Sequence, residues 1–185
     1  MALVKYARTC AKNVGGASFI AVAELASVTG VTVTAGEISA IAGTTPFKEI
    51  DAEQDTIKWD QNVEKVGNNN VKVTQAVEFG IAKPSTLNNT LLQSLIDGSP
   101  CGFLAIVVDG NGQAWLVGYN SVDLTRRPLR LEAAPRSTGG SPSDEAGQNF
   151  TPKLSCEGGG LALPFDTALN SAIAAGTSTI IDWNP

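Results

Sequence analysis

Two consecutive segments of the sequence alternate between apolar and polar residues, and a short turn signal separates them. In Thr56 to Val66, apolar side chains such as Trp59 and Val63 alternate with charged and amide side chains. The alternation resumes in Val71 to Ala82, after the glycine- and asparagine-rich turn at residues 67–70. A period of two is typical of a half-buried strand, and such a turn joins antiparallel neighbours. The two segments therefore predict a long antiparallel hairpin.

The polar side chains of this hairpin are predicted to share one face. They are Lys58, Asp60, Asn62 and Glu64 on the first strand, and Lys72, Thr74 and Glu78 on the second. The alternation continues over a length greater than one small core requires. We therefore expect this face to point into a lumen or toward a neighbouring subunit.

Shorter strands are predicted before the hairpin, and one helix after it. Glycines separate four strands that read as a meander: Ser18–Leu25, Val28–Thr34, Glu37–Ile41 and Thr45–Ile50. The segment Ser85 to Asp97 follows a proline, carries a leucine stripe and precedes Gly98, so it predicts a helix. We expect Leu91 and Leu95 of that stripe to be buried against the sheet.

The remaining segments predict further strands and two extended regions. A central hairpin joins Phe103–Val108 to Gln113–Tyr119, Leu129–Ala133 is predicted to pair with Phe150–Glu157, and a short helical turn is expected at Asp166–Ala174. Residues 135–149 are rich in Gly, Ser and Pro and predict a long mobile loop, and residues 176–185 predict a C-terminal arm.

These elements define the predicted fold class. The chain has 185 residues, which suits a single β-rich domain over residues 1–185, and its 19 Gly and 9 Pro favour strands joined by turns. The expected architecture is an antiparallel β-barrel or sandwich with one flanking helix.

The loop and the arm are candidates for contacts between subunits. The loop has no apolar anchor, whereas the arm ends in an apolar strip that one domain need not bury. The candidate residues are Ser137, Ser143, Asp144 and Glu145 in the loop, and Ile180, Ile181 and Trp183 in the arm.

Composition excludes several classes of function. The sequence has no histidine, which removes the commonest general base and the commonest zinc ligand, so no catalytic, cofactor or metal site is expected. A net charge of −5 argues against tight binding to nucleic-acid phosphates. The 3 cysteines are far apart and indicate a reducing compartment. No apolar run is long enough to cross a membrane, and Glu24 interrupts the stretch that most resembles a secretory signal.

One motif resembles a metal loop, but it is better explained as a turn. Asp109-Gly110-Asn111-Gly112-Gln113 places oxygen-bearing side chains at alternate positions, as a calcium loop does. Ala114 stands where that loop needs glycine, and no glutamate follows at its twelfth position. We therefore interpret the motif as the turn of the central hairpin.

Residues 56–157 resemble virion structural proteins encoded by phages and prophages of Bacteroidetes-type hosts. The resemblance rests on the charged alternating strand, the helix and four short motifs. These are Val73-Thr74-Gln75 through Ile81-Ala82-Lys83, Asp109 to Gly118 with Trp115-Leu116, Gly147 to Thr151, and Gly15-Gly16. The predicted architecture is also similar to that of tail tube proteins.

The resemblance implies a tail tube subunit that self-assembles into stacked hexameric rings around a DNA conduit, with DNA as non-specific cargo. It also implies other tail proteins as partners, no membrane contact, and assembly in the host cytoplasm into the virion. A head–tail connector, terminator or capsid-associated protein is the first alternative. A small enzyme or carbohydrate-binding module is the second, which a hydrolase or sugar-binding screen would reveal.

Overall fold

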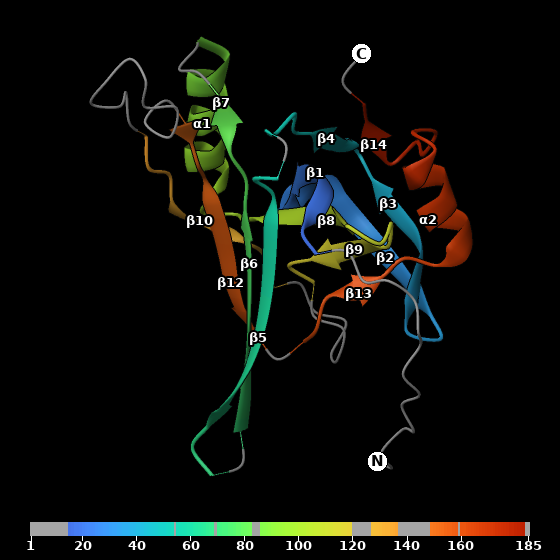
Figure 1. Ribbon diagram of the computed structural model, residues 1–185. Coiled ribbons are helices and arrows are strands. Elements are labelled where there is room, and N and C mark those ends of the chain that lie inside the picture. Colours follow the sequence, from blue (N-terminus) through green and yellow to red (C-terminus); the bar gives the residue numbers. More distant parts are fainter. Residues whose placement is uncertain are drawn as a thin grey trace.

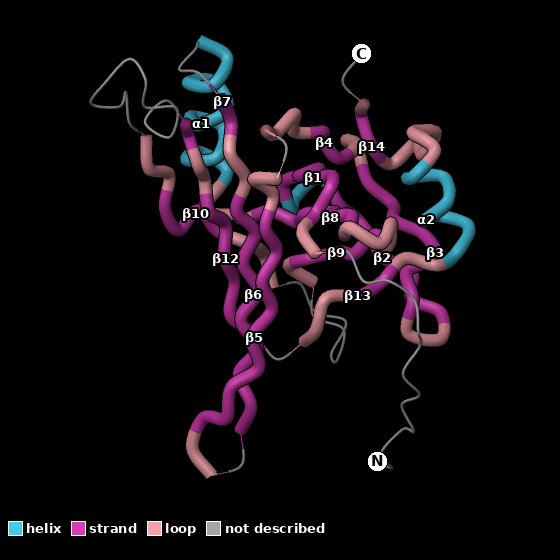
Figure 2. Tube along the Cα trace, in the orientation of Figure 1, coloured by secondary structure: helices cyan, strands magenta, loops and turns pink. Residues whose placement is uncertain are grey.

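The protein is described by a computed structural model that covers residues 15–53, 55–68, 70–82, 86–119, 127–136, 149–158 and 160–183. Within these ranges the chain is mainly β and contains two α-helices (Figures 1 and 2). The mainly β class predicted from the sequence is confirmed. The described sheets stack as antiparallel layers, and no sheet formed by the described residues closes into a barrel.

A six-stranded sheet forms the middle layer of the described residues, in the order β13-β9-β8-β1-β4-β14. Its strands are β1 (Ala17–Glu24), β4 (Phe47–Glu49), β8 (Phe103–Asp109), β9 (Ala114–Val117), β13 (Leu163–Pro164) and β14 (Ile181–Asp182). Every residue from Phe103 to Val108 is buried. Other layers cover both faces of β8, which explains why its sequence is continuously apolar instead of alternating.

A four-stranded sheet covers one face of the middle layer, in the order β10-β12-β6-β5. Its strands are β5 (Lys58–Val66), β6 (Asn70–Glu78), β10 (Arg130–Ala133) and β12 (Lys153–Gly158). Val77 and Leu154 of this outer sheet pack against Val107 of β8. Helix α1 (Thr86–Gly98) lies at one end of the layer beside the short pair β7 (Ile81–Ala82) and β11 (Asn149–Phe150).

A hairpin and a second helix cover the opposite face of the middle layer. The hairpin consists of β2 (Val28–Thr34) and β3 (Glu37–Gly43), and the helix is α2 (Thr167–Ala174); a short 3-10 turn, η1 (Leu25–Ser27), leads into β2. Ile38 of β3 and Ile173 of α2 pack against Ile106 of β8. The carboxylate of Asp166 accepts a hydrogen bond from the Leu169 N–H at 2.8 Å, so α2 begins where the helical turn was expected.

The predicted hairpins are confirmed. The β5–β6 ladder runs without a bulge from Lys58 opposite Glu78 to Val66 opposite Asn70. The hairpin β8–β9 and the pair β10–β12 also form where the sequence indicated.

Two predictions for the first half of the chain need correction. The meander is wrong, because β2 and β3 form a separate two-stranded sheet, while β1 pairs with β4 and β8. The leucine stripe of α1 is only partly buried: Leu95 is 3% exposed, but Leu87 is 77% exposed. Leu91 is half-buried at the edge of the core.

The prediction for the C-terminal arm is also corrected. β14 joins the middle sheet in parallel with β4, and Ile181 is 4% exposed. The ring of Trp183 lies 5.2 Å from that of Phe19, and its Nε1 donates to the Ser178 carbonyl. Ile180 packs against the same core. The apolar strip therefore packs against the core of its own chain, with Ile181 buried and Ile180 and Trp183 partly buried.

Candidate assembly surface

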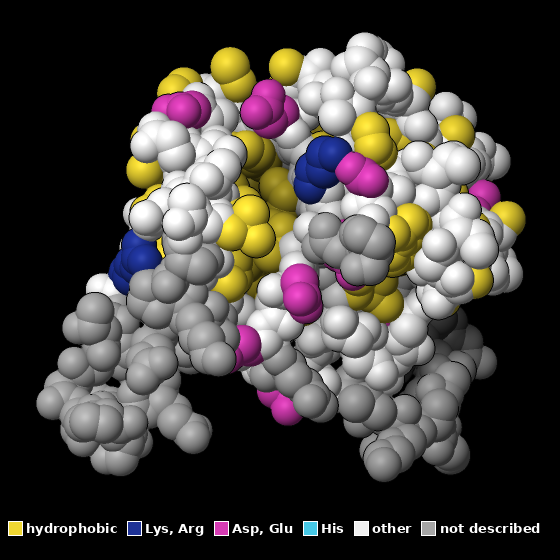
Figure 3. Space-filling view, turned by 90° about the horizontal axis from the view of Figure 1, so that it is seen from above, with side chains coloured by type: hydrophobic (Ala, Val, Ile, Leu, Met, Phe, Trp, Pro, Cys, Tyr) yellow, Lys and Arg dark blue, Asp and Glu magenta, His cyan; other side chains and the backbone are white. Residues whose placement is uncertain are grey.

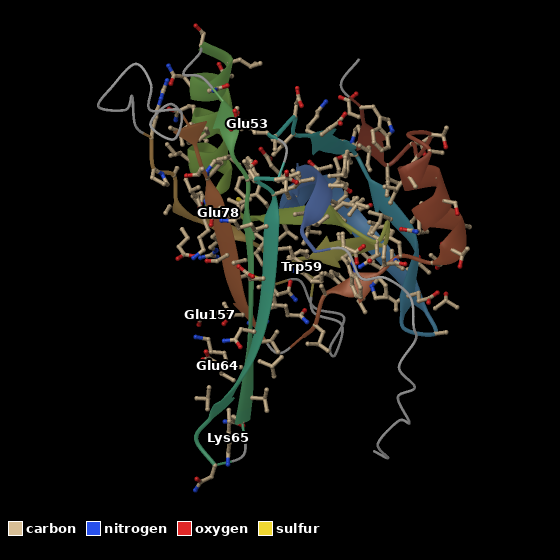
Figure 4. All side chains as sticks on the ribbon, in the orientation of Figure 1. Glu53, Trp59, Glu64, Lys65, Glu78 and Glu157 are labelled. Atoms are coloured by element: carbon tan, nitrogen blue, oxygen red, sulfur yellow. The ribbon has the colours of Figure 1, made fainter. Side chains whose placement is uncertain are left out.

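The seven polar residues predicted to share a face of the long hairpin do share it. Antiparallel partners point to the same side of a sheet, and the register places Lys58 opposite Glu78, Asn62 opposite Thr74, and Glu64 opposite Lys72. β12 extends this face with Lys153, Ser155 and Glu157. Figure 4 shows Glu78 and Glu157 on the side of the outer sheet that points away from the middle layer. We call this surface the polar face.

Ion pairs connect the strands across the polar face. The ammonium of Lys72 contacts the carboxylate of Glu157 at 2.5 Å, and that of Lys153 contacts Glu132 at 2.9 Å. Lys58 lies 3.9 Å from Glu78. These pairs are exposed to solvent and add little to stability, but they neutralise the lysines.

The titration of these groups follows from the pairing. The hydrogen bond to Glu157 raises the pKa of Lys72, and the hydrogen bond to Glu132 raises that of Lys153. The hydrogen bond from Lys153 lowers the pKa of Glu132, and a second one from Ser155 acts in the same direction. Lys72 and Lys153 therefore stay charged and Glu132 stays ionised near neutral pH, so this part of the face keeps both signs of charge.

The end of the long hairpin extends beyond the core. Along the inward face of β6, Val77, Gln75 and Val73 are at most 5% exposed, but Val71 is 59% exposed. On β5, Val63, which lies opposite Val73, is 55% exposed. Figure 1 shows this end of the hairpin pointing away from the layers. We call residues 63–66 and 70–72 the hairpin overhang.

The outer edge of β5 has no strand beside it among the described residues. β5 is the last strand of the outer sheet and pairs only with β6. The backbone N–H and C=O groups on its other side therefore form an open template for another strand. One side chain of β5 contacts another part of the chain: Oε1 of Gln61 accepts a hydrogen bond from the Ala162 N–H at 2.8 Å.

A groove of about 560 Å³ opens between α1 and the end of the middle sheet. Its lining is largely apolar, and Figure 3 shows a hollow with hydrophobic side chains on the face seen from above. We call it the α1 groove. The lining residues are Val22, Ala23, Glu24, Ser27, Thr45, Pro46, Lys48, Glu49, Ile50, Asp51, Ile81, Leu87, Asn88, Leu91, Ser94, Leu95 and Phe103.

The charge around the α1 groove is negative. Glu24, Glu49 and Asp51 contribute carboxylates, whereas Lys48 is the one basic residue among the described residues of the lining. The ammonium of Lys48 is paired with Asp182. The groove therefore combines a largely apolar lining with several acidic residues.

The other predicted site residues divide into two groups. Ile180, Ile181 and Trp183 are packed within the chain, as described above. Ser137, Ser143, Asp144 and Glu145 lie outside the described residues, as does most of the predicted loop at 135–149.

The motif that resembles a calcium loop is a hairpin turn. One carboxylate oxygen of Asp109 accepts from the N–H groups of Asn111 and Gln113, at 2.9 and 3.0 Å. The other accepts from Nε1 of Trp115 at 3.2 Å. In the part of the chain that the structure describes, no group of three acidic, cysteine or histidine side chains could hold a metal ion.

Sequence reasoning missed the α1 groove and the role of Gln75. Gln75 is 3% exposed and joins two parts of the fold, because its Nε2 donates to the Gly160 carbonyl and its Oε1 accepts from the Gly118 N–H. The signal was present, since Gln75 is a polar residue on the apolar face of a predicted strand. The groove left no such signal, because it arises from segments distant in sequence.

No protein-family model matches the chain, and no curated protein matches it significantly. Separately, none of the helices in the described ranges has the length and apolar character needed to span a membrane.

Proposed function

We propose that the chain is a structural subunit of a phage virion, the tail tube protein, which self-assembles into rings that stack around a DNA conduit. The phage role comes from the sequence resemblance of residues 56–157. The open edge of β5 carries the assembly part of the proposal.

The edge of β5 is suited to pairing with a second copy. The strand has nine residues and so spans about 30 Å. A long edge that has no bulge or proline, and that pairs with no strand among the described residues, favours pairing with another strand. If the β5 edge of each subunit binds a different surface on the next subunit, the same contact repeats from subunit to subunit until a ring closes.

The polar face supports a position on the inner wall of that ring. A conduit for DNA must not hold phosphates, and phosphate binding depends on lysines and arginines that are free to replace counterions. On this face Lys72 and Lys153 are each paired with a glutamate. Such a surface gives a passing duplex no cluster of unpaired cations to bind.

Negative-stain electron microscopy of the purified protein tests the proposal. Long tubes of constant diameter are the expected result. Single rings that never stack would favour a head–tail connector or terminator instead. A protein that stays monomeric at every concentration would contradict the self-assembly on which the proposal depends.

A pair of proline variants tests the β5 edge itself. Successive N–H groups of a strand point to opposite edges, so Asn62→Pro and Val63→Pro remove donors on opposite sides of β5. One variant breaks the pairing with β6 and lowers the melting temperature. The other leaves that pairing intact, keeps the melting temperature, and is expected to form no rings. Normal tubes from this second variant would show that the edge does not mediate assembly.

A further inference from the structure

Two surfaces at opposite ends of the outer layer have no partner among the residues that the structure describes. The hairpin overhang exposes Val63, Val66 and Val71, which are 55%, 48% and 59% exposed. The α1 groove has an apolar lining and stays open between α1 and the middle sheet. Figure 1 shows the overhang pointing down, whereas Figure 3 shows the groove on the face seen from above.

The distance between the two surfaces excludes a contact within one chain. β6 begins at Asn70 in the overhang and leads to Ile81, which lines the groove. Eleven extended residues separate these positions by roughly 35 Å at about 3.3 Å per residue. The same copy's overhang therefore cannot reach its own groove, but that of a second copy placed end to end can.

The chemistry of the two surfaces is complementary. The overhang presents valines together with the exposed ammonium-bearing Lys65, which the register places beside Val71. The groove presents apolar side chains from α1, and Glu24 and Asp51 contribute carboxylates to its lining. Burial of the valines supplies the attraction, and the opposite charges fix the orientation.

We propose that the hairpin overhang of one subunit docks into the α1 groove of the next subunit along the axis. The contact is heterologous, because each copy contributes a different surface, and it therefore extends without a built-in limit. The inference rests on the self-association in the proposed function, but it does not depend on the phage role. In this proposal the overhang and the groove form the contact between subunits along the axis, whereas the β5 edge forms the contact between neighbours within a ring.

Two variants remove one surface each. Val71→Asp places a charge on the overhang, and Leu87→Asp places one in the groove at a helix position that is 77% exposed. Both side chains are largely exposed, so neither change should lower the melting temperature. Ile96→Asp is the matched control, because Ile96 is an exposed apolar residue of the same helix outside the groove.

Mixing the variants is the decisive experiment, read by sedimentation velocity and electron microscopy. Each variant alone should stop at the lateral assembly, with an axial dissociation constant at least about tenfold higher than that of the wild type. The mixture retains one intact overhang and one intact groove, so it should form stacks of two units and no longer. If the β5 proposal is right the units are rings, and if it is wrong they are monomers. The two proposals can therefore fail separately.

A charge swap tests the predicted orientation. Lys65→Glu should weaken axial association, and Lys65→Glu combined with Asp51→Lys should restore it. Restoration is not expected if the two residues belong to unrelated surfaces.

Three results would overturn the inference. They are a wild-type chain that never associates end to end, a variant that elongates like the Ile96→Asp control, and a mixture that does not associate. A fourth result would also refute the proposal. If deletion of the basic segment at residues 2–14 abolishes stacking while Val71→Asp stacks normally, that segment, and not the overhang, occupies the groove.

Discussion

Gln75→Met should show how strongly one buried amide couples the outer sheet to the rest of the fold. Its two hydrogen bonds, at 3.1 Å to the Gly160 carbonyl and 2.9 Å from the Gly118 N–H, cross from β6 to two other segments. Methionine has a similar length and leaves little cavity. It cannot replace either bond.

The expected cost follows from the groups that lose their partners. A buried donor or acceptor left unsatisfied costs about 1–3 kcal/mol, so the pair costs roughly 2–6 kcal/mol. The more apolar methionine side chain recovers about 1–2 kcal/mol on burial. The difference between these terms spans about 0–5 kcal/mol, so we expect the free energy of unfolding to fall by about 2.5 kcal/mol, the middle of that range.

Urea unfolding followed by tryptophan fluorescence measures this change, at concentrations where the protein is monomeric. Gln93→Met is the control, because the exposed Gln93 makes one side-chain hydrogen bond to Asp97 on α1. The control should stay within about 0.5 kcal/mol of the wild type. Equal losses for both variants would refute the role assigned to the buried amide.

Two further predictions concern glycines and cysteines. Gly102 and Gly112 both have positive φ, but a Cβ on Gly102 would lie 2.3 Å from Cβ of Pro128, whereas Gly112 faces open space. Both alanine variants carry about 1–2 kcal/mol of backbone strain, but only Gly102→Ala adds a steric clash. The melting temperature of Gly102→Ala should therefore be well below that of Gly112→Ala. Equal melting temperatures would contradict the close approach at Gly102. Burial raises the pKa of the Cys156 thiol to about 11, while Cys101 is exposed. A thiol reagent at pH 8 should therefore label Cys101 at least about tenfold faster than Cys156. Peptide mapping by mass spectrometry measures the two labelling rates. Equal rates would contradict the burial of Cys156.

Local patterns in the sequence predicted the hairpins because each hairpin is specified by neighbouring residues. The β5–β6 ladder needs only alternation and a turn at residues 67–70, and both are visible in sequence. The order of strands in the middle sheet was not predictable in this way. β1 pairs with an edge of β8, which lies far away in the sequence, and other layers cover the two faces of β8; this arrangement appears only in three dimensions.

The C-terminal arm shows why exposure is difficult to infer from an apolar strip. Ile181 and Trp183 looked like an anchor for a partner, but β4 offers a free edge and Phe19 an aromatic contact within the same chain. The groove and the overhang were not predicted at all. Each arises because one element, the β5–β6 hairpin or α1, extends past the core that covers it. Neither surface is marked by a sequence motif.

The pairing of β1 with β8 has a consequence for how the chain folds during synthesis. Ala21 lies opposite Ile106, so β1 cannot pair with β8 until the ribosome has synthesised about 85 further residues. At roughly 5–20 residues per second the delay is on the order of 5–15 s. The β5–β6 hairpin closes locally within microseconds of its own synthesis, so its open edge exists before the core behind it. Crowded nascent chains would therefore meet first through this edge, and the yield of correct subunits should fall as expression rate rises.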